Sequence, residues 1–117
     1  MVNVKEVKNY FRNYKKNLDY IETYRNYLKE SDVKYLESNK ESERLKNAQT
    51  EIIIRDLLYY RLNDKEKNLI DMRYKYEMDV EEISSELYCS HSTYYRKMRK
   101  IYSKLSQELA EIKEIIK

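Results

Sequence analysis

Residues 79–105 read DVEEISSELYCSHSTYYRKMRKIYSKL, and this stretch predicts two helices joined by a tight turn. The segment 91–104 contains five basic residues and no Asp or Glu, whereas residues 63–90 contain eight acids against four bases. A short acidic helix followed directly by a basic one is typical of a helix-turn-helix whose second helix enters a DNA groove.

Capping residues and apolar spacing support both helices. Asp79 has Glu82 three positions later, which is the spacing of a capping box, and Ser90 is placed to cap the second helix. Apolar residues follow at helical spacing and predict one inner face for each helix. These residues are Val80, Ile83 and Leu87 in the first helix, and Tyr94, Met98, Ile101 and Leu105 in the second.

The remaining positions of the second helix are predicted to face outward with groups that suit DNA. Arginine binds guanine edges or phosphates, hydroxyl groups reach phosphate oxygens, and a helix N-terminus attracts phosphate. A solvated charged face is the alternative interpretation, but it does not explain why caps, turn and charge agree. The candidate DNA-binding residues are Ser90, His91, Ser92, Thr93, Tyr95, Arg96, Lys97, Arg99, Lys100 and Lys104.

A family resemblance covers residues 62–105, through the stretches LNDKEK (62–67), LIDMRY (69–74), VEEIS (80–84), SHSTYYR (90–96) and KL (104–105). These stretches resemble region 4 of the sigma-70 family and the sigma-like regulators of bacteriophages, such as the RinA and ArpU late-gene activators. The resemblance implies that the helix after Ser90 reads the major groove, with residues 90–93 and Arg96 in contact. It also implies late-gene activation through contact with RNA polymerase.

Two positions depart from the family pattern. Tyr88 stands where the turn often has Gly, and a non-Gly residue with positive φ costs about 1 kcal/mol or more. His91 and Ser92 replace the basic residues that usually begin the second helix. These departures concern promoter specificity and leave the predicted groove-binding geometry intact.

Composition predicts an all-α protein with long, solvent-exposed helices. The 117 residues include no Gly and no Pro, which argues against β-hairpins, and 38% are charged, with a mean hydropathy of −1.00. The net charge is only +3, so the basic charge is segregated and not large. The single cysteine, and the lack of a signal peptide or an apolar span, predict a reduced, cytoplasmic setting without membrane insertion.

The chain divides by pattern into two segments. Residues 1–43 are predicted to form a long heptad helix, a short helix from Ser31 through Leu36 and a polar linker over 37–43, and residues 44–117 the helix-turn-helix domain. Helices are expected over 42–61, after a cap at Asn63, and from 91 to about 117. The C-terminal part of the last helix is expected to pack on the 42–61 helix or to form a dimer. The heptad positions are Val4, Val7, Phe11, Tyr14, Leu18, Ile21 and Leu28.

The sequence does not predict an enzyme or a cofactor site. It has one histidine, and Cys89 with His91 supplies two ligands, which do not make a zinc site. The leading hypothesis is a phage or prophage transcriptional regulator that binds duplex DNA, with a homodimer through the heptad helix as one option. The alternatives are a helical assembly protein, such as a small terminase subunit, and a coiled-coil adaptor that does not bind DNA.

Overall fold

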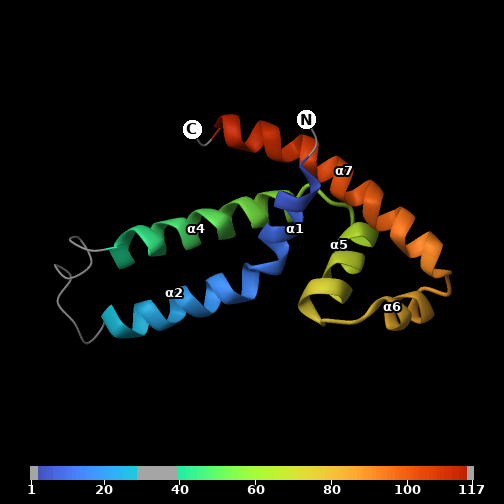
Figure 1. The fold of residues 1–117 in the computed structure, drawn as a ribbon, viewed down its shortest axis with the longest axis horizontal. Coiled ribbons are helices and arrows are strands. Elements are labelled where there is room, and N and C mark those ends of the chain that lie inside the picture. The colour runs from blue at the N-terminus through green and yellow to red at the C-terminus, as the bar shows by residue number, and fades with distance from the viewer. Residues whose placement is uncertain (1–2, 29–39, 116–117) are drawn as a thin grey trace.

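The computed structural model describes residues 3–28 and 40–115, and within these ranges it contains helices and no strand (Figure 1). The all-α fold predicted from the sequence is therefore confirmed. None of the helices in these ranges is both long and apolar enough to cross a bilayer. The elements are α1 (Val4–Arg12), α2 (Tyr14–Leu28), α4 (Lys40–Tyr59), α5 (Asp64–Ile70), the π-helix η1 (Asp71–Lys75), α6 (Val80–Glu86) and α7 (His91–Ile115).

The N-terminal heptad pattern forms two helices where the sequence predicts one. Asn3 caps α1, since its side-chain oxygen accepts a hydrogen bond from the Glu6 backbone N–H at 3.0 Å. Asn13, with φ −89° and ψ −1°, separates α1 from α2, and the chain turns there (Figure 1). Asn favours such breaks because its side chain competes locally for backbone hydrogen bonds. The predicted single helix is thus replaced by a bent pair.

Because of this bend, the two halves of the heptad pattern pack against different helices. Val7 and Phe11 are buried, at 0% and 3% exposure, where α1 packs on α7 and α4. The second half lies in α2, which packs antiparallel to α4, and Leu18 there stays 40% exposed. The apolar pattern of α1 is therefore satisfied within the chain, and the Leu28 side chain lies outside the described residues.

Helix α4 begins earlier and ends earlier than predicted, at Lys40 and Tyr59 instead of 42 and 61. Its inner face includes Ala48, Ile54 and Leu58, all buried. Ile53 and Leu57, whose apolar side chains predict a wider inner face, are instead 55% and 38% exposed. They lie on the side of α4 that neither α2 nor the core covers. The short helix expected over 31–36 lies outside the described residues, as do residues 37–39 of the predicted linker, whereas residues 40–43, also predicted to be linker, belong to α4.

The segment after α4 has the predicted cap and an unpredicted π-helix. Asn63 and Glu66 form the expected capping box at the start of α5, with bonds of 2.8 and 3.0 Å. The wider turns of η1 follow directly, and the Tyr76 N–H donates to the Asp71 carbonyl five residues back at 2.9 Å. This change of period turns Tyr76 outward, to 61% exposure, although its helical spacing predicts an inner position.

Helix α7 is the longest helix among the described residues, and its buried side chains form much of the core (Figure 1). Its predicted inner residues Tyr94, Met98, Ile101 and Leu105 are all buried. The tail continues the stripe and packs against both α1 and α4. One core cluster joins Val7 and Phe11 of the first predicted segment to residues of α4, α5, η1, α6 and α7. Ile116 lies outside the described residues.

Candidate nucleic-acid interface

The turn between α6 and α7 is a Schellman motif, which fixes the angle between the two helices. The Tyr88 N–H donates to the Ser85 carbonyl at 3.2 Å, and the Cys89 N–H donates to the Ser84 carbonyl at 3.0 Å. Tyr88 has φ 53°, the left-handed conformation that its position in the turn predicts. Cys89 packs half-buried against the core, where this motif places an apolar contact.

Replacing Tyr88 with Gly is expected to leave stability unchanged or raise it by up to about 1 kcal/mol, because the left-handed strain disappears. The Tyr88 ring is 97% exposed, so little packing is removed. Tyr76→Gly is the matched control, since Tyr76 is also exposed but has φ −94°. In urea unfolding, the control should lower the free energy of unfolding by about 0.5–1 kcal/mol, because glycine loses more backbone entropy on folding. A larger loss for Tyr88→Gly than for the control would contradict the strain at Tyr88.

Capping side chains begin both helices as predicted. Asp79 and Glu82 form a capping box on α6, with bonds of 2.8 and 3.2 Å. Ser90 Oγ accepts from the Thr93 N–H at 3.1 Å and donates to Thr93 Oγ1 at 3.0 Å. Ser90 and Thr93, both candidate DNA-binding residues, therefore already bond to each other at the start of α7. Their bond orients the first turn of the helix.

The outer side of α7 presents most of the other candidate residues to solvent. His91, Ser92, Arg96, Arg99 and Lys100 are exposed. Tyr95 is 52% exposed, and its ring lies edge-on to Tyr94 at 5.2 Å between centroids. Burial of Tyr94 raises the pKa of its hydroxyl, which stays protonated at neutral pH. The outer side of α7 thus combines hydroxyl, imidazole and guanidinium groups on one rigid helix.

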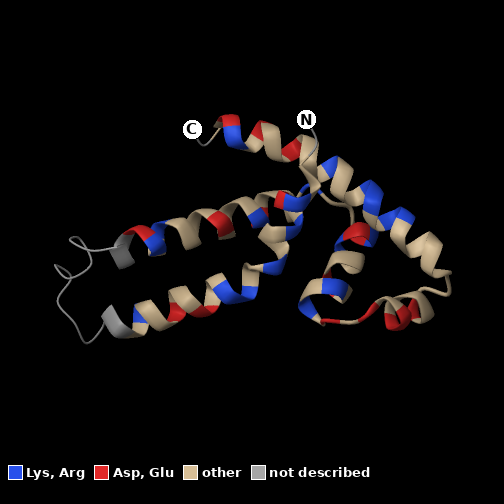
Figure 2. Ribbon diagram, viewed as in Figure 1, with Lys and Arg blue, Asp and Glu red and all other residues tan. Residues whose placement is uncertain are grey.

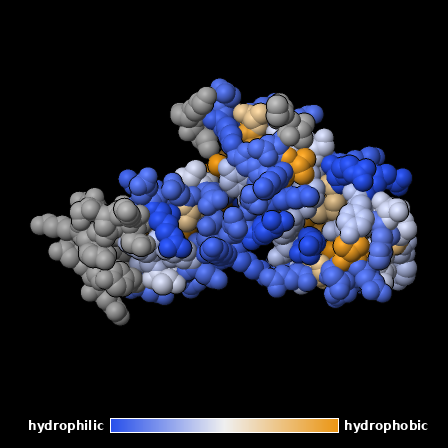
Figure 3. Space-filling model, viewed as in Figure 1, coloured by the Kyte–Doolittle hydropathy of each residue, from blue (hydrophilic) through white to orange (hydrophobic). Residues whose placement is uncertain are grey.

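The cations of this outer side differ in whether the protein already neutralises them. Lys104 Nζ lies 3.1 Å from Glu66 Oε1, so this candidate is held by an ion pair with the α5 cap. Arg96, Lys97, Arg99 and Lys100 have no ion-pair partner among the described residues. Figure 2 shows basic residues along α7 and acidic residues on α6, and Figure 3 shows strongly hydrophilic side chains over this part of the surface.

The chemistry of the α6–α7 unit comes from its charged and hydroxyl side chains. No family model, curated protein or solved structure matches the chain significantly. In the described part of the chain, no three His, Cys, Asp or Glu side chains converge as metal ligands. What the unit can do chemically is bind an extended polyanion over the exposed cations of α7.

A second basic feature lies beside α7, and the sequence did not single it out. Lys8 and Arg12 of α1 and Arg73 of η1 line a groove of about 180 Å³ against the start of α7. Lys8 and Arg12 stand four residues apart on one helix face, which the sequence could have indicated. Their position next to α7 depends on the bend at Asn13 and on the packing of α1.

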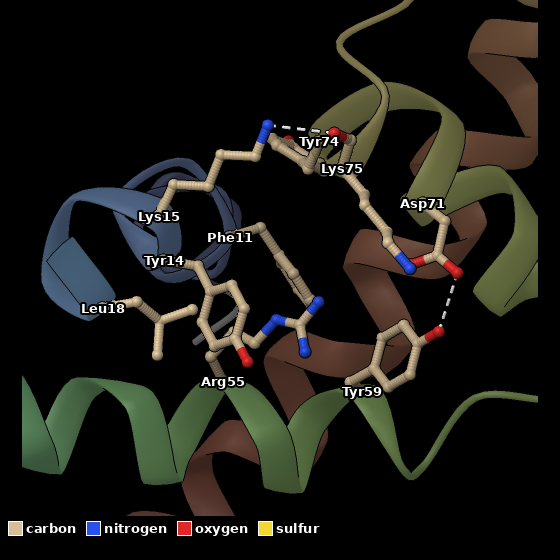
Figure 4. Close-up of a pocket in the computed structure, with 9 residues that line it drawn as sticks. All are labelled: Phe11, Tyr14, Lys15, Leu18, Arg55, Tyr59, Asp71, Tyr74 and Lys75. Carbon is tan, nitrogen blue, oxygen red and sulfur yellow. Dashed lines mark hydrogen bonds between the residues drawn. The ribbon is translucent and has the colours of Figure 1, made fainter. Parts of the chain in front are cut away.

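A cavity of about 390 Å³ lies where α1, α2, α4 and η1 meet, and Figure 4 shows its lining. The Arg55 guanidinium lies 3.9 Å from the Tyr14 ring centroid and pairs with Asp56 at 3.1 Å. The Tyr59 hydroxyl donates to Asp71 at 2.9 Å. Burial, as the largest cause, together with this hydrogen bond raises the pKa of Tyr59 to about 12. Lys15 donates to the Lys75 carbonyl at 2.9 Å. These mutual bonds indicate a structural junction between the N-terminal helices and η1.

Proposed function

We propose that this protein is a sequence-specific, duplex-DNA-binding transcriptional regulator of the sigma region 4-like type found in bacteriophages. The unit α6–turn–α7 acts as a helix-turn-helix, and the first half of α7 enters the major groove. Ser92, Tyr95, Arg96 and Arg99 contact base edges and phosphates there. Activation of late genes through RNA polymerase is the role that the resemblance over residues 62–105 implies.

The observation behind this proposal is a group of basic side chains without ion-pair partners on α7, a helix that is capped at its start and packed on the core. Arg96, Lys97, Arg99 and Lys100 are exposed and lack acidic partners among the described residues, while Tyr94 and Met98 on the opposite side are buried. A protein that leaves adjacent cations unpaired on a rigid helix concentrates positive potential, and duplex DNA is the common partner of such a surface.

A second candidate function, assembly of a viral particle or packaging complex, is favoured by one apolar surface. Ile53, Leu57 and Tyr60 are exposed at spacings of four and three along α4 and its end, at 55%, 38% and 73%. Such a stripe suits contact between copies of the chain. The mass in solution separates the two candidates, since a large ring favours packaging and a monomer or dimer favours regulation.

The double variant Arg96→Ala/Arg99→Ala tests DNA binding. Each arginine that makes a bidentate contact with a base edge contributes about 1–3 kcal/mol, so we expect affinity for a selected duplex to fall about 5- to 150-fold for each such residue. The slope of log K against log salt should become shallower by about 0.9 for each phosphate that the variant no longer neutralises. Binding is measured by fluorescence anisotropy, on duplexes selected from a random library by the wild-type protein and on a mixed-sequence duplex.

Arg25→Ala/Lys46→Ala is the matched control, because both residues are exposed on α2 and α4, outside α7. It removes the same charge and should leave affinity and salt slope close to those of the wild type. Equal affinity of the Arg96/Arg99 variant and the wild type for a selected duplex contradicts the assignment of α7 to the groove. Absence of any salt-dependent binding by the wild type contradicts the DNA-binding function itself.

A further inference from the structure

The groove beside α7 is lined by residues of four elements, α1, η1, α6 and α7. Helix α1 supplies Lys8 and Arg12, η1 supplies Arg73 and Tyr74, and the first turns of α7 supply the opposite wall. The volume of about 180 Å³ is too small for a drug-sized ligand but fits a phosphate group. The lining residues are Lys8, Arg12, Arg73, Tyr74, Val80, Tyr94, Tyr95, Met98 and Tyr102.

The charge of this groove is entirely positive. Lys8, Arg12 and Arg73 line it, and no Asp or Glu does. None of the three has an ion-pair partner in the described ranges. Lys8 Nζ lies 5.1 Å from the centroid of the Tyr102 ring, and an Arg73 terminal nitrogen donates to the Met78 carbonyl at 3.3 Å. Three neighbouring cations without a carboxylate match an anion with several charged oxygens.

Buried aromatic rings hold the walls of the groove in place. The Tyr74 and Tyr102 hydroxyls hydrogen-bond at 2.5 Å, which ties η1 to α7. The Phe11 ring stacks on Tyr74 at 5.6 Å between centroids, which ties α1 to η1. Phe11 and Tyr102 are only 3% and 7% exposed. The cations therefore project from a framework that already exists without a ligand, so binding requires little reorganisation.

The groove meets the outer side of α7 at Tyr95. Tyr94 and Met98 form its wall, and half-exposed Tyr95 lies at its rim, next to Arg96 and four residues before Arg99. A helix inserted into a major groove about 12 Å wide has a sugar–phosphate strand along each flank. Because α1 packs on α7, a strand on the side of α7 where α1 lies would pass the cations of α1 and η1.

We propose that Lys8, Arg12 and Arg73 bind the sugar–phosphate backbone of the DNA strand that flanks α7, so that α1 extends the DNA-binding surface beyond the helix-turn-helix. This inference rests on the proposed DNA-binding function and assigns a second, sequence-independent contact area to it. Phosphate contacts set register and orientation on the duplex, whereas base contacts on α7 set specificity. The N-terminal helix then acts as a backbone clamp.

The variant Lys8→Gln/Arg12→Gln tests the clamp, and glutamine keeps the polar character and much of the length of each side chain. We expect the salt slope to become shallower by about 2, because each phosphate contact contributes about 0.9. Affinity should fall by the same factor on selected and mixed-sequence duplexes, since phosphate contacts do not read sequence. Lys5→Gln/Lys46→Gln is the control, because both residues are exposed and neither lines the groove.

The outcomes separate the clamp from the DNA-binding function. The clamp is supported if the Lys8/Arg12 variant has a shallower slope on both duplexes while the control keeps the wild-type slope, with both variants melting like the wild type. It is overturned if the Lys8/Arg12 variant keeps the wild-type slope while Arg96→Ala/Arg99→Ala binds more weakly, because DNA then binds α7 alone. A wild-type protein that shows no salt-dependent binding overturns both the clamp and the function.

Discussion

Replacing Phe11 with Ala is expected to destabilise the protein by about 3–5 kcal/mol, the usual cost of truncating a buried phenylalanine. Phe11 is 3% exposed, stacks on Tyr74 and lies 5.5 Å from the Arg55 guanidinium, measured to the ring centroid. Its removal opens a cavity at the junction that joins α1 to α4 and η1. Urea unfolding should show a lower midpoint with an unchanged m-value.

Leu18→Ala is the control for this prediction, because Leu18 belongs to the same heptad pattern but is 40% exposed. It should cost less than about 1 kcal/mol, as surface substitutions usually do. The contrast reports which half of the N-terminal pattern is buried within the chain. Similar losses for both variants, together with a change of mass in solution for Leu18→Ala, would mean that α2 packs on a second copy.

Replacing Ile112 with Ala is expected to cost about 2–5 kcal/mol, because Ile112 is 1% exposed in the tail of α7. Ile115, three residues later on the same helix, is 74% exposed, so Ile115→Ala should change stability by no more than about 0.5 kcal/mol. The two substitutions remove the same atoms from the same helix. Their difference therefore isolates the packing of the tail on α1 and α4, as measured by urea unfolding.

The order of these two effects tests the placement of the tail. A large loss for Ile115→Ala that depends on protein concentration would show that the exposed side of α7 lies in an interface between copies. A small loss for Ile112→Ala would show that the tail does not pack on α1 and α4. Both measurements are independent of DNA.

The local features of the chain followed from the sequence because they depend on neighbouring residues. Asn63 with Glu66, Asp79 with Glu82, and Ser90 with Thr93 cap their helices as predicted, since each bond spans three residues. The buried face of α7 followed from the 3.6-residue period. The left-handed turn at Tyr88 followed from the position that glycine often occupies.

Tertiary packing decided the features that depend on distant residues. The exposure of Ile53 and Leu57 could not be read from α4, because apolar residues on both sides of a helix do not say which side has a neighbour. The π-helix at 71–75 changed the period and turned Tyr76 outward. The bend at Asn13 directed α1 onto α7 instead of continuing the heptad helix.

The candidate site divides in the same way. The sequence by itself determined the bases of α7 and their outward direction, because charge and helical period are local properties. Only the tertiary structure decided that Glu66 neutralises Lys104 while Arg96 and Arg99 stay unpaired, and that Lys8, Arg12 and Arg73 line one groove. Such contacts join residues that are far apart in the sequence. The burial of Val7 and Phe11 holds α1 against α7, and this packing places Lys8 and Arg12 beside α7.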